Sequence, residues 1–183
     1  ALAWLDEGQP DVLALQELKC VEDAFPRLEF EAKGYKAVIS GQKTYNGSAI
    51  LSRLPIEDPM VGLPGDDSDE QARYVEATIN GVRIASIYLP NGNPVDTEKF
   101  PYKIGWMKRL YARAAELAAT GEPVALLGDY NVIPTDEDCY DPRAWDGDAL
   151  TRAESRAEFR SILNLGYYDA FRVAKPNAPA AYT

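Results

Sequence analysis

Residues 73–89 carry the feature that most restricts the fold. Two strand-like runs rich in β-branched side chains flank the dipeptide Asn80-Gly81. Asn-Gly between two such runs is the strongest short-range signal for a β-hairpin, because both residues accept the positive φ angles of a two-residue turn. The sequence therefore predicts an antiparallel pair of strands near the middle of the chain.

Further strands and helices are expected on both sides of this hairpin. Short apolar runs predict strands at residues 11–16, 35–40, 48–52 and 123–127. Three- and four-residue apolar spacing and stop signals predict helices at residues 1–8, 22–33, 102–120 and 152–165. Hairpin signals mixed with strand–helix–strand signals favour an α/β sandwich, and the length suits one domain over residues 1–183.

The composition excludes several classes of protein. A net charge of −10 argues against a protein that coats nucleic acid through a broad basic face. The absence of histidine removes His-metal sites and Ser-His or Cys-His dyads from this stretch. Cys20 and Cys139 form no CxxC pattern, which fits a reducing cytoplasm. No apolar run approaches the ~18 residues of a membrane helix, and no signal peptide is visible.

Two predicted strands end in carboxylates. Glu17 follows the strand at residues 11–16, and Asp129 and Asn131 follow the strand at residues 123–127. An acid just past a buried strand projects from a rigid support into the crevice where α/β sheets place ligands. Mg²⁺ holds one or two carboxylates and leaves room for phosphate and water. The alternative is that both acids cap neighbouring loops.

A second candidate group closes the hairpin. Tyr88 ends its second strand, and Asn91 lies in the following Pro-Asn-Gly turn, so a phenol and an amide could contact a phosphate. The alternative is an ordinary strand-end tyrosine and turn. Lys43 and Asn46 form a basic turn that could lie against a DNA backbone. Arg73 could steer a phosphate or pair with the acids at residues 66–70.

Five motifs in order carry a family resemblance: Pro10-Asp-Val-Leu-Ala-Leu-Gln-Glu-Leu-Lys19, Tyr45-Asn-Gly-Ser-Ala-Ile-Leu-Ser-Arg53, Ile87-Tyr-Leu-Pro-Asn-Gly92, Leu127-Gly-Asp-Tyr-Asn-Val-Ile-Pro134 and Leu165-Gly-Tyr-Tyr-Asp-Ala-Phe-Arg172, with Ala181-Tyr-Thr183 behind. The chain resembles exonuclease III and its apurinic/apyrimidinic endonuclease relatives, within the endonuclease/exonuclease/phosphatase superfamily. The resemblance implies a DNase I-like, four-layered α/β sandwich with two central mixed sheets.

The same resemblance implies a metal-dependent phosphodiesterase with Mg²⁺, or Mn²⁺, as cofactor. Such enzymes cut duplex DNA 5′ to abasic sites and remove nucleotides from 3′ ends. Glu17 would be the metal ligand and Tyr88 would contact the scissile phosphate. Asp129 would orient or activate the attacking water, while Asn131 and Asn91 would hold the phosphate.

Compared with the family pattern, the chain lacks the first strand and a final segment that carries an Asp-His pair. The resemblance therefore implies a domain cut at both ends, inactive or nearly so as the 183-residue chain. The full-length protein is expected to be a monomer, whereas exposed sheet edges favour association of the fragment.

Two other functions remain open at this stage. One is a superfamily phosphodiesterase or phosphatase that acts on a phospholipid or an inositol phosphate. The other is a fragment that binds DNA or a partner protein without cutting.

Overall fold

The computed structural model describes residues 2–176 and residue 178, so Ala1 and the motif at residues 181–183 lie outside the described residues. The chain divides into two compact units. The sheet unit comprises residues 1–88 and 121–130, and the helical unit comprises residues 89–120 and 131–183.

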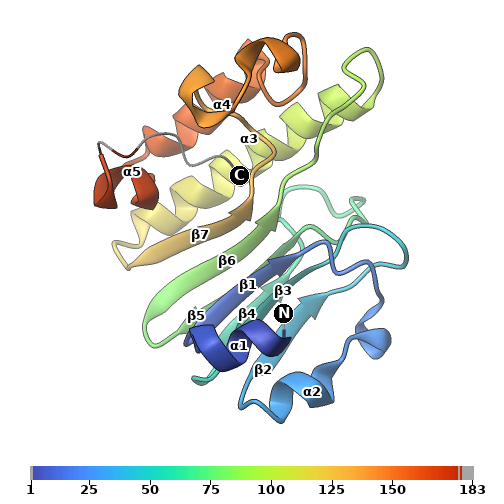
Figure 1. Cartoon of the computed structure of the whole chain (residues 1–183), viewed down its shortest axis with the longest axis vertical. Helices are drawn as coiled ribbons and strands as arrows, with labels where there is room; N and C mark the ends of the chain where they lie inside the picture. Colours follow the sequence, from blue (N-terminus) through green and yellow to red (C-terminus); the bar gives the residue numbers. More distant parts are fainter. Residues whose placement is uncertain (1, 177, 179–183) are drawn as a thin grey trace. The chain divides into compact units, whose positions relative to one another are not determined.

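The first sheet of the sheet unit has three strands in the order β1-β3-β2 (Figure 1). Its members are β1 (Val12–Gln16), β2 (Lys36–Ser40) and β3 (Ser48–Ser52). Both neighbours of β3 run antiparallel to it, and all three strands lie where the sequence predicts strands. Helices α1 (Leu2–Gly8) and α2 (Arg27–Glu31) supply Leu5 and Phe30 to a buried cluster with side chains of this sheet.

The second sheet has four strands in the order β4-β5-β6-β7, with β6 and β7 parallel (Figure 1). Its members are β4 (Glu57–Val61), β5 (Tyr74–Ile79), β6 (Val82–Tyr88) and β7 (Val124–Asp129). The predicted hairpin is confirmed: Asn80 and Gly81 have φ angles of 50° and 76°, which the two-residue turn requires.

The two sheets pack on each other within the sheet unit. Strand β1 packs against β6 and β7, and β3 packs against β5 and β6. Ile50, Val75 and Ala77 are fully buried in the cluster between them. Each large aliphatic side chain buried in this way stabilises the fold by roughly 1.5–3 kcal/mol relative to its exposed state. The expectation of an α/β fold built on two sheets is therefore confirmed.

The helical unit is built on α3 (Lys99–Ala119), which packs against α4 (Ala153–Leu163). Its other elements are the short helices η2 (Asp136–Asp138), η3 (Pro142–Trp145) and α5 (Ala170–Ala174). The apolar face of α3 follows the predicted spacing, with Trp106, Met107 and Leu110 buried. The helix begins at Lys99 rather than at the predicted Tyr102, because Pro101 is tolerated in a first helical turn.

Three elements differ from the sequence-based expectation. The helix predicted over residues 22–33 is divided into η1 (Glu22–Ala24) and α2, because Pro26 has no N–H and disfavours a helical conformation in the residue before it. Strand β4 was not predicted: it is a mostly exposed strand with a register shift and contains Pro59, so it lacks the apolar alternation of a buried strand. Helix α5 is too short to show a helical period.

Candidate functional site

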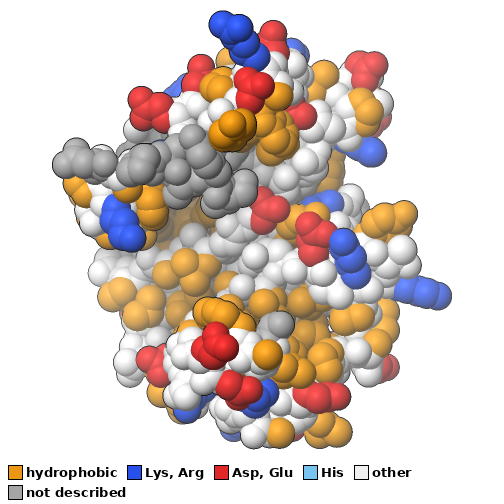
Figure 2. Space-filling view, in the orientation of Figure 1, with side chains coloured by type: hydrophobic (Ala, Val, Ile, Leu, Met, Phe, Trp, Pro, Cys, Tyr) orange, Lys and Arg blue, Asp and Glu red, His pale blue; other side chains and the backbone are white. Residues whose placement is uncertain are grey.

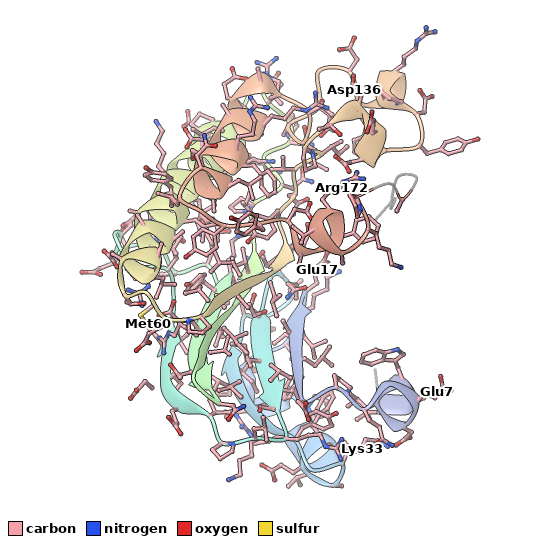
Figure 3. All side chains as sticks on the ribbon, turned by 90° about the vertical axis from the view of Figure 1, so that its left-hand side faces the viewer. Glu7, Glu17, Lys33, Met60, Asp136 and Arg172 are labelled. Atoms are coloured by element: carbon pink, nitrogen blue, oxygen red, sulfur yellow. The ribbon has the colours of Figure 1, made fainter. Side chains whose placement is uncertain are left out.

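Glu17 lies immediately after β1, at the end of that strand away from Lys33 (Figure 3). Its side chain is 46% exposed, and its carboxylate forms an ion pair with the Lys19 ammonium at 2.7 Å. Glu17 and Lys19 have φ angles of 55° and 54°. Positive φ is uncommon for residues other than glycine and persists where the surrounding structure enforces it. The local backbone thus turns the Glu17 carboxylate out of the strand.

Tyr88 and Asp129 are paired in register on the parallel strands β6 and β7, so their Cα atoms are direct neighbours at the ends of the two strands. Gly128 allows this close approach. A Cβ atom on Gly128 would lie 2.0 Å from the Ile87 carbonyl oxygen, and the φ of Gly128 is 139°. Only glycine fits this position without displacing the backbone of β6.

A buried serine joins the end of β1 to β6. The Gln16 side-chain amide donates to Ser86 Oγ at 2.9 Å, and Ser86 Oγ donates to the Leu15 carbonyl at 3.1 Å. Ser86 lies two residues before Tyr88 and Gln16 lies one residue before Glu17. The two sheets therefore bring Glu17 close to the Tyr88 phenol, which contributes to lowering the pKa of the Glu17 carboxyl.

The pKa shifts at this cluster have clear causes. Burial raises the pKa of Tyr88 above its ordinary value of 10.0, and the Glu17 and Asp129 carboxylates add to the effect. The hydrogen bond from Lys19 lowers the pKa of Glu17 below its ordinary value of 4.5. At neutral pH the phenol is therefore a protonated hydrogen-bond donor beside an ionised carboxylate.

Arg73 is bound to Tyr88 rather than to the acids at residues 66–70. Its guanidinium lies over the Tyr88 ring, 4.8 Å from the ring centroid, and its Nη1 donates to the Tyr88 carbonyl at 3.2 Å. The Tyr88 N–H donates to the Arg73 carbonyl at 2.8 Å. Arg73 thus holds Tyr88 by a cation–π contact and one hydrogen bond from its guanidinium, and by a second hydrogen bond between the two backbones.

The two residues of the predicted basic turn, Lys43 and Asn46, differ in exposure. Lys43 is exposed, whereas Asn46 is buried and donates through Nδ2 to Gln42 Oε1 at 2.8 Å. The Asn46 carbonyl accepts from the Lys19 N–H at 2.9 Å. The structure therefore places Lys43 towards solvent and Asn46 against the segment that carries Glu17.

The helical unit holds the other two predicted residues, Asn91 and Asn131. Asn91 Nδ2 donates to Asn131 Oδ1 at 3.1 Å, and Asn131 Nδ2 donates to the Leu89 carbonyl at 2.8 Å. The Lys103 ammonium, which is fully buried, donates to the carbonyls of Asn91, Asn131 and Ala149 at 3.0, 2.5 and 3.3 Å. The backbones of the two asparagines are therefore held by the same buried ammonium, that of Lys103.

Several residues of these clusters were not predicted. Lys19, Gln42 and Ser86 act through hydrogen bonds or ion pairs that the sequence does not reveal. Lys103 did leave a signal, because it falls on the same helical face as Trp106, Met107 and Leu110. A lysine at a core position of an amphipathic helix indicates a buried ammonium with defined acceptors.

The Glu17 region fits a hard divalent cation. Among the residues that the structure describes, no group of three or more His, Cys, Asp or Glu side chains surrounds a common point. Mg²⁺ does not require one, because it binds through one or two carboxylates and completes its octahedron with water and phosphate oxygens. The exposed, ionised Glu17 carboxylate supplies the kind of oxygen ligand that such a site uses.

The charge pattern on one face and the hydropathy of the described helices bear on binding to nucleic acid and to membranes. On the face drawn in Figure 2, acidic and basic side chains of the described residues are interspersed rather than gathered in one basic stripe. None of the helices described in residues 2–176 combines the length and hydropathy needed to cross a bilayer.

Comparisons with known proteins place this geometry in context. The model of the endonuclease/exonuclease/phosphatase family matches residues 1–182. Exodeoxyribonuclease III of Haemophilus influenzae is 30% identical over 96% of this chain and 70% of its own length. A 3′-5′ exonuclease from Neisseria meningitidis superposes with a TM-score of 0.93 at 40% identity, over 98% of this chain and 70% of that one. An AP endonuclease from Archaeoglobus fulgidus gives 0.92 at 34% identity, over 98% and 69%.

Proposed function

This chain belongs to the endonuclease/exonuclease/phosphatase family, and we propose that it carries the active centre of a DNA repair nuclease of the exodeoxyribonuclease III type. The reaction is metal-dependent hydrolysis of phosphodiester bonds. The observation that carries the proposal is the convergence of Glu17, Tyr88 and Asp129 at one end of two packed sheets.

Glu17 is the proposed ligand of the divalent cation, with Mg²⁺ as the ion and Mn²⁺ as the alternative. A bound cation would polarise the phosphate and offset the negative charge that develops on it. It would also reduce the repulsion between DNA and a chain of net charge −10.

Asp129 is the proposed residue that orients the attacking water and accepts its proton, since it lies at the exposed end of β7. The Tyr88 phenol, protonated at neutral pH, donates a hydrogen bond to a phosphate oxygen. Arg73 holds the phenol ring for that contact.

Asn91 and Asn131 are proposed as further phosphate contacts. In the sequence, Asn91 follows Tyr88 by three residues and Asn131 follows Asp129 by two. The two amides are held in one geometry by their mutual hydrogen bond and by the Lys103 ammonium, which donates to the backbone carbonyls of both residues. Lys43, exposed in its turn, is the proposed contact to a more distant backbone phosphate.

The proposed substrate is duplex DNA, cut 5′ to an abasic site or shortened from its 3′ end. The names of the similar proteins, an AP endonuclease and a 3′-5′ exonuclease, support these two activities. We propose action as a monomer in the cytoplasm, where the free thiols of Cys20 and Cys139 stay reduced.

The test compares three substrates: a labelled duplex with one abasic site, a duplex with a recessed 3′ end, and vesicles that contain a phosphoinositide. Each is incubated with Mg²⁺ or with EDTA, using the 183-residue chain and the longest natural protein that contains it. We expect the longest natural protein to incise the abasic duplex with Mg²⁺ and not with EDTA, and the 183-residue chain to show little or no incision. Intact DNA together with phosphate release from the vesicles would assign the site to a lipid phosphatase, and binding of DNA without cleavage would make the protein a non-catalytic binder.

A further inference from the structure

We propose that Gln42 is a positioning residue, which holds the Glu17 segment in register with residues 72–73, the segment before β5 that contacts Tyr88. The inference rests on the proposed function, because it treats Glu17 as the metal ligand. Gln42 lies in the loop between β2 and β3, within the sheet unit.

The Gln42 side chain joins two separate segments through one oxygen. Its Oε1 atom accepts a hydrogen bond from Asn46 Nδ2 at 2.8 Å and a second from the Ala72 N–H at 3.1 Å. Asn46 and Ala72 are only 9% and 6% exposed. Water therefore has little access to either donor, and loss of the acceptor would leave both donors unsatisfied.

The first of these connections reaches the Glu17 segment. The Asn46 carbonyl accepts from the Lys19 N–H at 2.9 Å, and the Gly47 carbonyl accepts from the Leu18 N–H at 3.3 Å. The two segments are also in close contact, since a Cβ atom on Gly47 would lie 2.7 Å from Leu18 Cβ. The position of the 46–47 backbone thus sets the position of residues 17–19, whose strand end is seen in Figure 3.

The second connection reaches Tyr88. Ala72 also accepts through its carbonyl from the Gly47 N–H at 2.8 Å, so the loop is tied to residue 72 twice. The next residue, Arg73, holds Tyr88 through its guanidinium and its carbonyl. Gln42 therefore stands between the segment that orients the carboxylate of Glu17 and the segment that orients the phenol of Tyr88.

The backbone conformation near Glu17 requires support from neighbouring groups. Glu17, Lys19 and Asn46 all have positive φ angles, of 55°, 54° and 55°. A conformation that is unfavourable for glutamate and lysine persists only where neighbouring groups enforce it. The hydrogen bonds that Gln42 accepts help to enforce this conformation. Without them, the backbone of Glu17 could relax towards ordinary negative φ values.

The expected consequence is a weaker metal site. Residues that orient a metal ligand typically contribute about 10–100-fold to metal affinity. Gln42→Met keeps the length of the side chain and removes the accepting oxygen. Gln42→Glu keeps an oxygen that can accept from Asn46 Nδ2 and from the Ala72 N–H, and is the matched control.

The experiment measures Mn²⁺ binding to the folded 183-residue chain by electron paramagnetic resonance, which reports free Mn²⁺ and does not depend on catalysis. We expect Gln42→Met to raise the Kd by about tenfold, and Gln42→Glu to bind at least as tightly as the unaltered chain. Equal affinity of Gln42→Met and the unaltered chain would overturn the inference, and so would a Gln42→Glu variant as weak as Gln42→Met.

Two further variants separate the possible failures. Glu17→Gln should abolish binding; if it does not, or if the unaltered chain binds no Mn²⁺, the proposed metal role of Glu17 is wrong and the inference falls with it. If Glu17→Gln abolishes binding and Gln42→Met does not weaken it, only the role of Gln42 is wrong.

Should Gln42→Met fail to fold, Asn46→Gly replaces it, because glycine keeps the positive φ and the carbonyl while removing the donor to Gln42. Unchanged affinity in Asn46→Gly would then overturn the inference.

Discussion

The two units of the chain hold polar clusters of opposite kinds. In the sheet unit, the cluster of Glu17, Lys19 and Tyr88 is partly exposed, and its centre is the ion pair between the Glu17 carboxylate and the Lys19 ammonium. In the helical unit, the amides of Asn91 and Asn131 are fixed by a buried ammonium that donates to backbone carbonyls. The first cluster can exchange its partners for a metal or a phosphate, whereas the second is suited to hold one geometry.

The largest expected effect is on stability in the sheet unit. Gly128→Ala would put a Cβ atom 2.0 Å from the Ile87 carbonyl oxygen at a φ of 139°. Overlap with backbone cannot be relieved by a rotamer change, so we expect a loss of about 3 kcal/mol or more in the free energy of unfolding. Urea denaturation followed by circular dichroism measures it.

Gly105→Ala in α3 is the matched control in the helical unit. Apart from its chain neighbours and the backbone of α3 itself, no atom of the described residues lies within 4 Å of the Cβ position. Alanine there should stabilise by about 0.4–1 kcal/mol. If both substitutions changed stability equally, the close approach of β6 and β7 beside Asp129 would not be a constraint.

The two lysines give the next comparison. Lys103→Met should cost about 2 kcal/mol or more, because three carbonyls lose a buried donor. Lys19→Met should leave the melting temperature unchanged, since its ion pair with Glu17 is exposed. Thermal unfolding of both variants checks this, and similar losses in the two would show that the clusters do not differ in rigidity.

A smaller effect concerns acid stability in the helical unit. Burial would raise the pKa of Asp138, but hydrogen bonds from Thr135 and Arg172 outweigh it and lower the pKa below 3.8. A lowered pKa in the folded state stabilises above pH 3.8 and loses that contribution as the pH falls through the folded-state value. Asp138→Asn should therefore lower the Tm by about 2–4 °C at pH 6.

The same comparison must disappear in strong acid. Below the folded-state pKa, Asp138 is protonated and resembles asparagine, so the two unfolding curves should coincide. A difference in Tm that is independent of pH would contradict the role given to the ion pair of Asp138 with Arg172.

The sequence predicted the exposed cluster better than the buried links. Glu17 follows β1 and Asp129 ends β7, two strands whose apolar runs are local, and the Asn80-Gly81 turn fixes where Tyr88 ends its strand. Ser86 and Gln42 could not be predicted, because Ser86 bonds Gln16 from 70 residues away and Gln42 bonds Ala72 from 30. The effect of Pro26 on the helix at residues 22–33 was within reach of local rules.

The most direct test of the central claim is single-turnover incision of a labelled duplex with one abasic site, using the longest natural protein that contains this chain. Glu17→Gln and Asp129→Asn are compared with Glu7→Gln and Asp23→Asn, which change exposed acids on helical segments of the same unit. Each of the first two substitutions should lower the rate about 100-fold or more, while the controls stay within roughly twofold. Incision by Glu17→Gln and Asp129→Asn at the rate of their controls would contradict the central claim.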